Sequence, residues 1–152
     1  MAGFHQPAPI AAHTYEDIDT RDTKLFEFLK KPDMNCPLII FGAENMCAKI
    51  EKNLPGRRVF DVVDKETMDD VQMRSSKMKD EIILLYDGHV IGVDIRTEVP
   101  LRVVILCKAN DLPTRTNFQQ MAGRAFRSKY FPKCHVFTTT GVDTEDQVCM
   151  RI

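Results

Sequence analysis

The sequence predicts an α/β domain in which a mostly parallel sheet is flanked by helices. Short, fully apolar runs alternate with amphipathic stretches along the chain, which is typical of doubly covered strands joined by helical crossovers. The 152 residues are enough for one domain with its own core. A content of 43% apolar and 28% charged residues is ordinary for a soluble globular domain.

Five apolar runs are the predicted strands. Each is short, rich in branched or aromatic side chains, and bounded by polar residues, proline or glycine. Runs such as PLIIF and EIILLY are apolar almost throughout, as expected for strands buried on both faces. In order, the predicted strands are residues 37–41, 57–63, 81–86, 101–107 and 134–138.

The segments between these runs contain the predicted helices. The first carries four apolar side chains with helical spacing and stops at a proline. The second has one apolar face and stops at a Pro-Gly pair, and the third is polar with a few apolar anchors, which predicts a surface helix. In order, the predicted helices are residues 22–31, 43–54, 65–78 and 117–128.

This pattern divides the chain into three parts. Residues 1–20 are expected to be a flexible lead-in, residues 21–142 the folded domain, and residues 143–152 a polar tail. The ligand sites of such a domain are expected in the loops beyond the carboxyl ends of its strands.

Composition excludes several classes of function. A net charge of -1 argues against a protein that holds nucleic acid by its bulk field alone. The five cysteines form no CxxC pair, so we predict reduced thiols, no metal site, and a cytoplasmic or nuclear location. No apolar run approaches the roughly 20 residues of a membrane-spanning helix, so no membrane association is expected.

The run QMAGRAFR at residues 120–127 is the strongest motif. Arg124 and Arg127 lie three residues apart on a predicted helix and so share one face. A guanidinium fork grips phosphate oxygens in a bidentate way. The run resembles motif VI of superfamily 2 helicases, whose two arginines act as fingers on a triphosphate held by the other lobe. By this resemblance Arg124 and Arg127 are the catalytic candidates, and Gln120 and Gly123 are nucleotide-binding candidates.

A second run, IILLYDGHVIGVDI at residues 82–95, is similar to motif V of the same family. There a strand leads to a glycine and to an aspartate that bonds the nucleotide ribose, which makes Gly92 and Asp94 nucleotide-binding candidates. Tyr86 and Asp87 are candidates for nucleic-acid contact. Tyr86 stands where the family often has threonine, which puts the usual hydroxyl contact to the nucleic-acid backbone in question.

A third run, PLIIFGAE at residues 37–44, resembles motif IV, a strand whose following loop faces nucleic acid. Gly42 and Ala43 are the candidates it contributes. The three runs occur in the family's order within residues 36–139. Together they resemble the C-terminal lobe of a superfamily 2 helicase or translocase, which implies a three-layer RecA-like domain.

The elements of a complete ATPase site are missing from the sequence. No GxxxxGK[ST] phosphate loop occurs, and no strand ends in the Asp-Glu pair that supports magnesium. The resemblance therefore implies that ATP with Mg²⁺ is bound mainly by an N-terminal RecA-like lobe, in cis or in trans. RNA or DNA is the expected further partner, and the isolated chain is expected to be inactive as an ATPase.

Three alternatives remain open at this point. The chain fits a catalytically inactive, helicase-like scaffold, since it lacks the phosphate loop and carries Tyr86. It equally fits the motor lobe of a protein translocase, because these motors share the lobe. An unrelated doubly wound enzyme is the third reading, although His89 is the only histidine in an expected functional loop and no nucleophile accompanies it.

Overall fold

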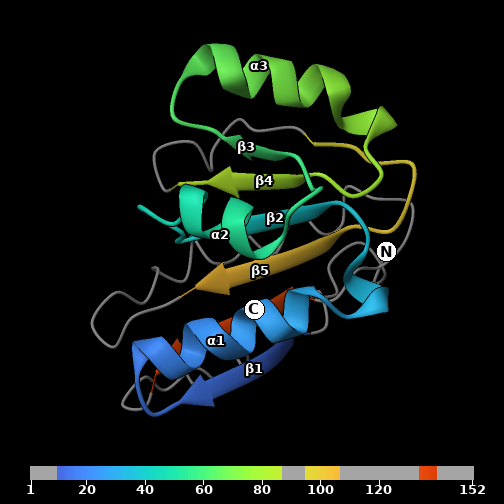
Figure 1. Ribbon diagram of the computed structural model, residues 1–152. Coiled ribbons are helices and arrows are strands. Elements are labelled where there is room, and N and C mark those ends of the chain that lie inside the picture. The colour runs from blue at the N-terminus through green and yellow to red at the C-terminus, as the bar shows by residue number, and fades with distance from the viewer. Residues whose placement is uncertain (1–9, 87–94, 107–133, 140–152) are drawn as a thin grey trace, which may run out of the picture.

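The computed structural model describes residues 10–86, 95–106 and 134–139. Six strands form one parallel sheet in the order β1-β6-β5-β2-β4-β3 (Figure 1). The strands are β1 (Ile10–Tyr15), β2 (Leu38–Phe41), β3 (Val59–Asp61), β4 (Ile82–Leu85), β5 (Arg102–Leu106) and β6 (Cys134–Thr139). The helices are α1 (Ile18–Leu29), α2 (Cys47–Asn53) and α3 (Lys65–Arg74), with 3₁₀ turns η2 (Pro32–Met34) and η3 (Ser75–Lys77).

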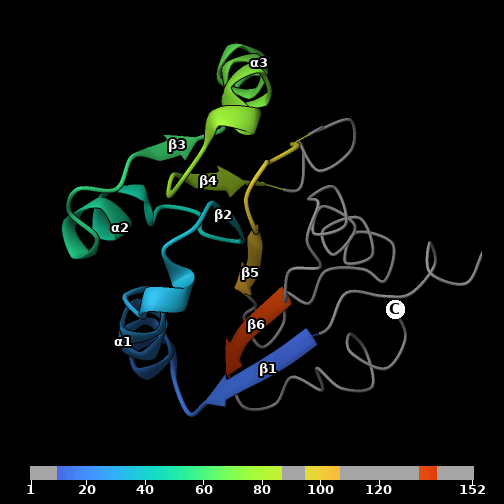
Figure 2. The ribbon, with the colours of Figure 1, turned by 90° about the vertical axis from the view of Figure 1, so that its right-hand side faces the viewer.

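The sheet is buried on both faces because successive side chains of each strand alternate between two apolar clusters. Helices α1 and α2 cover one face, as Figure 2 shows, and pack on Ile40, Leu84 and Val104. On the other face, Val71 of α3 packs in a cluster with Ile39, Ile83 and Val103. Burial of the central strands on both sides explains why their sequences are almost continuously apolar.

All five predicted strands are confirmed, but the sequence analysis missed a sixth. β1 lies inside the segment expected to be a flexible lead-in and pairs in parallel with β6 from Ile10↔Cys134 to Tyr15↔Thr139. Helix α1 likewise begins at Ile18, four residues before the predicted start at Asp22. The expectation of a lead-in is therefore corrected for residues 10–20, where strand pairing and helix hydrogen bonds order the backbone.

The second helix is shorter than predicted. The sequence predicts a helix from Ala43, whereas α2 begins at Cys47. Gly42 and Asn45 have positive φ angles of 82° and 63°, which no helix accommodates. Residues 42–46 are therefore the turn that joins β2 to α2. The predicted helix at residues 117–128 lies outside the described residues.

Candidate functional site

The carboxyl ends of the parallel strands bring together the turns that follow β2, β3 and β4. In an open α/β sheet, ligands bind beyond these ends where the connections diverge to opposite sides. Here β2 leads to β3 and β4 on one side, whereas β5, its neighbour on the other side, leads to β6. The divergence therefore lies between the ends of β2 and β5.

Gly42 marks this point. Its φ of 82° is a left-handed conformation, and a Cβ atom built there would lie 2.3 Å from the carbonyl oxygen of Leu106, the last residue of β5. Only glycine permits this approach. The next residue, Ala43, is fully buried. The turn after β2 is thus held against the end of β5, so two loops that the sequence analysis assigned to ligands start side by side.

Tyr86 follows β4 and is anchored by Asp61 at the end of β3. The phenolic hydroxyl donates a hydrogen bond of 2.5 Å to Asp61 Oδ1. Burial, together with that bond and the charge of Asp61, raises the pKa of Tyr86. The hydroxyl therefore stays protonated and is engaged by a carboxylate.

A hollow of about 520 Å³ opens beside this pair, and we call it the carboxyl-end hollow. Of the residues that the structure describes, two carboxylates and no lysine or arginine line it, and the full described lining is Glu44, Asn45, Cys47, Ala48, Asp61, Val63 and Tyr86. Such a lining disfavours a phosphate group, because the charges repel. A nucleic-acid backbone is therefore not gripped by these side chains alone.

Cys47 is the one thiol among the described residues that line this hollow. Burial raises the pKa of Cys47 to about 11, and its hydrogen bond to Glu51 Oε1, at 3.1 Å, contributes in the same direction. At neutral pH the thiol is therefore protonated and a poor nucleophile.

The described residues bring together Gly42, Ala43 and Tyr86 from the sequence-predicted site. The remaining candidates lie outside the described residues: Asp87, Gly92, Asp94, Gln120, Gly123, Arg124 and Arg127. The sequence analysis gave no role to Asp61, which fixes Tyr86. The signal it overlooked is a single carboxylate inside the apolar run RRVFDVV.

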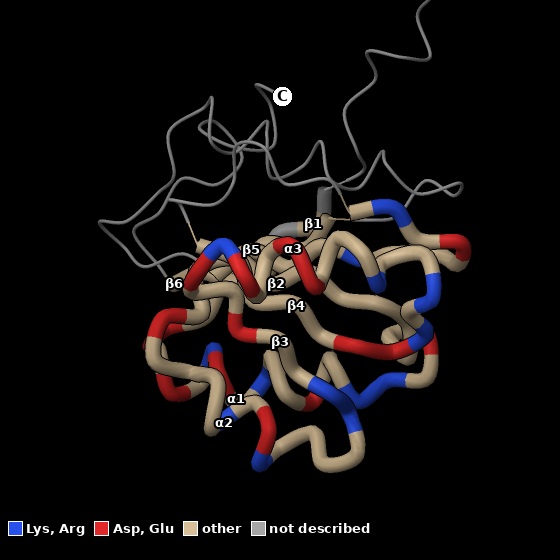
Figure 3. Tube along the Cα trace, turned by 90° about the horizontal axis from the view of Figure 1, so that it is seen from above, with Lys and Arg blue, Asp and Glu red and all other residues tan. Residues whose placement is uncertain are grey.

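The part of the chain that the structure describes has neither a metal-binding cluster nor a membrane-spanning helix. There, no three His, Cys, Asp or Glu side chains are grouped so as to hold a metal ion. No helix in the same part is long and apolar enough to cross a membrane. Charged positions of both signs occur along the described part of the chain (Figure 3).

Comparison with known proteins gives matches in structure alone. No family model matches the sequence, and no curated protein matches it. The DEAD-box helicase Mss116 bound to single-stranded RNA and UDP-BeF aligns with a TM-score of 0.70 at 16% identity, over 90% of this chain. Domain 2 of Mss116p bound to an RNA duplex aligns with a TM-score of 0.65 at 15% identity, over 85% of this chain.

The chain has the fold of a DEAD-box helicase domain. The Escherichia coli DEAD-box protein SrmB, bound to regulator of ribonuclease activity A, shares this fold with a TM-score of 0.62 at 12% identity, over 88% of this chain and 78% of SrmB. The chain spans only 29% of the Mss116 chain and 54% of the domain-2 chain. The RecA-like fold predicted from the motifs is therefore confirmed.

Proposed function

We propose that the chain is the C-terminal lobe of a helicase-like, ATP-driven motor that acts on RNA. An N-terminal RecA-like lobe, in cis or in trans, supplies the phosphate loop and binds ATP with Mg²⁺. Arg124 and Arg127 act as fingers on the γ-phosphate, where they stabilise charge in the transition state. The nucleotide contacts of this lobe are Gly92, Asp94, Gln120 and Gly123.

The observation that carries the proposal is the packing of Gly42 against the end of β5. The motif-IV-like turn starts at Gly42, and the connection that contains residues 120–127 starts after Leu106. Gly42 and Leu106 lie so close together that a Cβ atom built at Gly42 would be 2.3 Å from the carbonyl oxygen of Leu106. The motif-V-like run continues from Tyr86 at the end of β4, which neighbours β2. Three motif-bearing connections therefore leave one edge of the sheet, as a site shared between two lobes requires.

Similar folds support the choice of ligands. The Mss116 structure contains single-stranded RNA and UDP-BeF, and a Saccharomyces cerevisiae Dbp5 structure of TM-score 0.54 contains RNA and ADP with BeF₃. Beryllium fluoride stands in for the γ-phosphate in both. By analogy, we propose RNA as the nucleic acid and ATP as the fuel of this lobe.

A second candidate function is a helicase-like scaffold without catalysis. The acidic lining of the carboxyl-end hollow favours it, together with the bond that ties the Tyr86 hydroxyl to Asp61. Both features reduce the capacity of this edge to hold an RNA phosphate. In this role the lobe would bind a partner protein and no motor cycle would follow.

The test is ATP hydrolysis by a protein that joins this chain to an N-terminal lobe with a phosphate loop. RNA-stimulated turnover is expected. Arg124→Ala and Arg127→Ala should each lower the rate about 10³-fold or more, with the nucleotide still bound. Arg74→Ala is the matched control, because Arg74 is an exposed arginine that pairs only locally with Asp70. Turnover that neither finger variant changes would reject the arginine assignment, and no RNA-stimulated turnover in the parent would favour the scaffold.

A further inference from the structure

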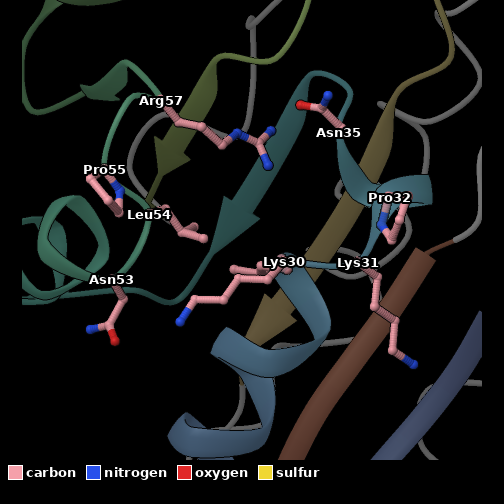
Figure 4. A pocket seen from close by; sticks show the side chains of 9 residues that line it. Lys30, Lys31, Pro32, Asn35, Asn53, Leu54, Pro55 and Arg57 are labelled. Atoms are coloured by element: carbon pink, nitrogen blue, oxygen red, sulfur yellow. The ribbon is translucent and has the colours of Figure 1, made fainter.

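A second hollow lies at the opposite edge of the sheet, and we call it the amino-end hollow. It has a volume of about 400 Å³ and lies between the ends of α1 and α2 (Figure 4). Both helices run back from the carboxyl ends of the strands, so their last residues lie near the strand starts. Its lining residues are Leu29, Lys30, Lys31, Pro32, Asn35, Asn53, Leu54, Pro55 and Arg57. The proposed ATP and RNA contacts begin at the other edge.

The described residues that line the amino-end hollow include three cations and no carboxylate. Arg57 is its fixed charge. Its guanidinium donates to the backbone carbonyls of Asp80 at 2.7 Å, Met34 at 3.1 Å and Cys36 at 2.6 Å. Burial lowers the pKa of Arg57 from its ordinary value, but a guanidinium remains charged at neutral pH. Carbonyl dipoles orient this charge, and the nearby charges of Asp80 and Glu81 favour its protonated form.

Lys30 is the cation that can reach a ligand. It caps the C-terminus of α1, its side chain is exposed, and no described carboxylate forms an ion pair with it. Lys31 is different, because its amine lies 5.6 Å from the centre of the Phe28 ring. Figure 4 shows the Lys31 amine turned toward β1 and away from Arg57. The positive charge available to an occupant therefore comes from Lys30 and Arg57.

The rest of the lining is apolar or amide. Leu29 and Leu54 are buried with 2% and 5% of their surface exposed, and two prolines stand beside them. The amide nitrogen of Asn53 donates to the carbonyl of Lys49 at 2.8 Å. Its amide oxygen remains a possible acceptor for a peptide N–H. The amino-end hollow therefore combines the apolar side chains of Leu29 and Leu54, the amide of Asn53 and positively charged side chains.

We propose that the amino-end hollow binds an acidic peptide segment of a partner protein. Carboxylates of the segment would pair with Lys30 and Arg57, its apolar side chains would lie on Leu29 and Leu54, and its backbone would bond Asn53. Single-stranded nucleic acid fits less well, because such sites use aromatic side chains for base stacking and none of the described residues that line this hollow is aromatic. The partner would occupy the lobe without displacing ATP or RNA.

The experiment measures fluorescence anisotropy of a labelled Asp-Leu-Asp-Leu-Asp-Leu peptide with the whole chain. Saturable binding that weakens as salt rises is expected. Lys30→Glu should weaken binding at least tenfold, and Lys30→Arg should retain it. The matched control is Lys65→Glu, an exposed lysine at the start of α3, which packs on the opposite face of the sheet from α1 and α2 and should leave the affinity unchanged. Circular dichroism of each variant shows whether the fold is kept.

Several outcomes would overturn the proposal. One is an Asn-Leu-Asn-Leu-Asn-Leu peptide that binds as tightly as the acidic one. Another is equal weakening by Lys30→Glu and Lys65→Glu, which would indicate bulk electrostatics. Absence of binding at millimolar peptide also rejects it. The last outcome is displacement of the peptide by an oligothymidylate or by inorganic phosphate. If this displacement depends on Lys30, the amino-end hollow is a phosphate-binding site instead.

Discussion

Gly42 and Gly56 have almost the same backbone conformation in very different surroundings. Their φ angles are 82° and 89°. A Cβ at Gly42 would meet Leu106 O at 2.3 Å, whereas a Cβ at Gly56 would meet no heavy atom within 4 Å. The pair therefore separates the cost of a left-handed conformation from the cost of a steric clash.

We expect Gly42→Ala to lower the free energy of unfolding by about 3 kcal/mol, because left-handed strain of about 1 kcal/mol adds to overpacking of about 2 kcal/mol. Gly56→Ala should cost only about 1 kcal/mol. Urea denaturation of both variants measures the difference. Equal losses of unfolding free energy in the two variants would mean that β5 can shift away from the turn without an energetic penalty. The close approach of Gly42 to Leu106 would then not require glycine.

Tyr86 and Asp61 form the second residue-scale feature. Tyr86→Phe keeps the ring and removes the donor, so the free energy of unfolding should fall by about 1 to 2 kcal/mol, as for a hydrogen bond to a charged acceptor. A double-mutant cycle with Asp61→Ala isolates the pair, and a coupling energy of the same sign and size is expected. Strict additivity of the two single substitutions would show that the bond contributes nothing to stability.

At the scale of elements, β1 is held to β6 and α1 by a ring cluster. His13 Nε2 and His135 Nδ1 lie 3.2 Å apart. His13 stacks on Phe137 with ring centres 4.4 Å apart, and Phe28 of α1 lies 4.6 Å from the His135 ring. A hydrogen bond between two ring nitrogens needs a proton on one and a lone pair on the other. Protonation of both rings would break it.

This cluster predicts an acid-sensitive contribution to stability. Burial, and then the charge of Lys31, lower the pKa of His13. His13 therefore binds a proton more readily in the unfolded chain, where the pKa of histidine is about 6.5. The contribution of this cluster to the free energy of unfolding is fully present above that pH. It is lost as the pH falls from there toward the lower pKa of folded His13. Thermal unfolding between pH 5 and 7.5 measures this. His13→Gln should flatten the profile, and an equally steep profile in that variant would assign the effect to other groups.

The first residues of α1 and α3 show how well the apolar spacing of the sequence locates the start of a helix. The apolar spacing of the first helix begins at Leu25, but the helix itself begins earlier because Asp17 accepts a hydrogen bond of 2.7 Å from the Thr20 backbone N–H. An aspartate side chain at the N-cap accepts from a backbone N–H of the first turn, and the apolar spacing carries no information about it. Asp64 caps α3 in the same way, and there the predicted start at residue 65 agrees with the structure.

At the scale of the whole molecule, the sheet separates two kinds of surface. The carboxyl edge carries the turns of the proposed motor site, and the amino edge carries the basic hollow. Because rigid parallel strands lie between them, a partner at one edge leaves the other accessible. A motor lobe of this kind would be tethered or regulated without loss of its nucleotide contacts.

The isolated chain should hydrolyse ATP no faster than background, because its sequence contains no phosphate loop for arginine fingers to act on. Phosphate release by purified chain, with and without single-stranded RNA, measures this. Clear turnover that survives repeated purification would contradict the half-site model. Addition of a separate lobe with a phosphate loop is the positive control.

The sequence alone determined the class of fold and the order of the motifs. Apolar runs of strand length between amphipathic segments require a doubly covered parallel sheet, whatever the surroundings, because burial on two faces leaves no room for polar side chains. It also indicated that an ATP site would be incomplete, since the missing phosphate loop is a local pattern.

Only the tertiary structure decided what depends on residues far apart in the chain. β1 is a strand because β6, more than a hundred residues later, offers its edge, and the half-polar run IAAHTY does not reveal this. Tyr86 is bound to Asp61, Gly42 must be glycine because of Leu106, and Arg57 is fixed by three carbonyls from two segments far apart in the chain. Each depends on a contact between segments, which a pattern along one segment does not contain.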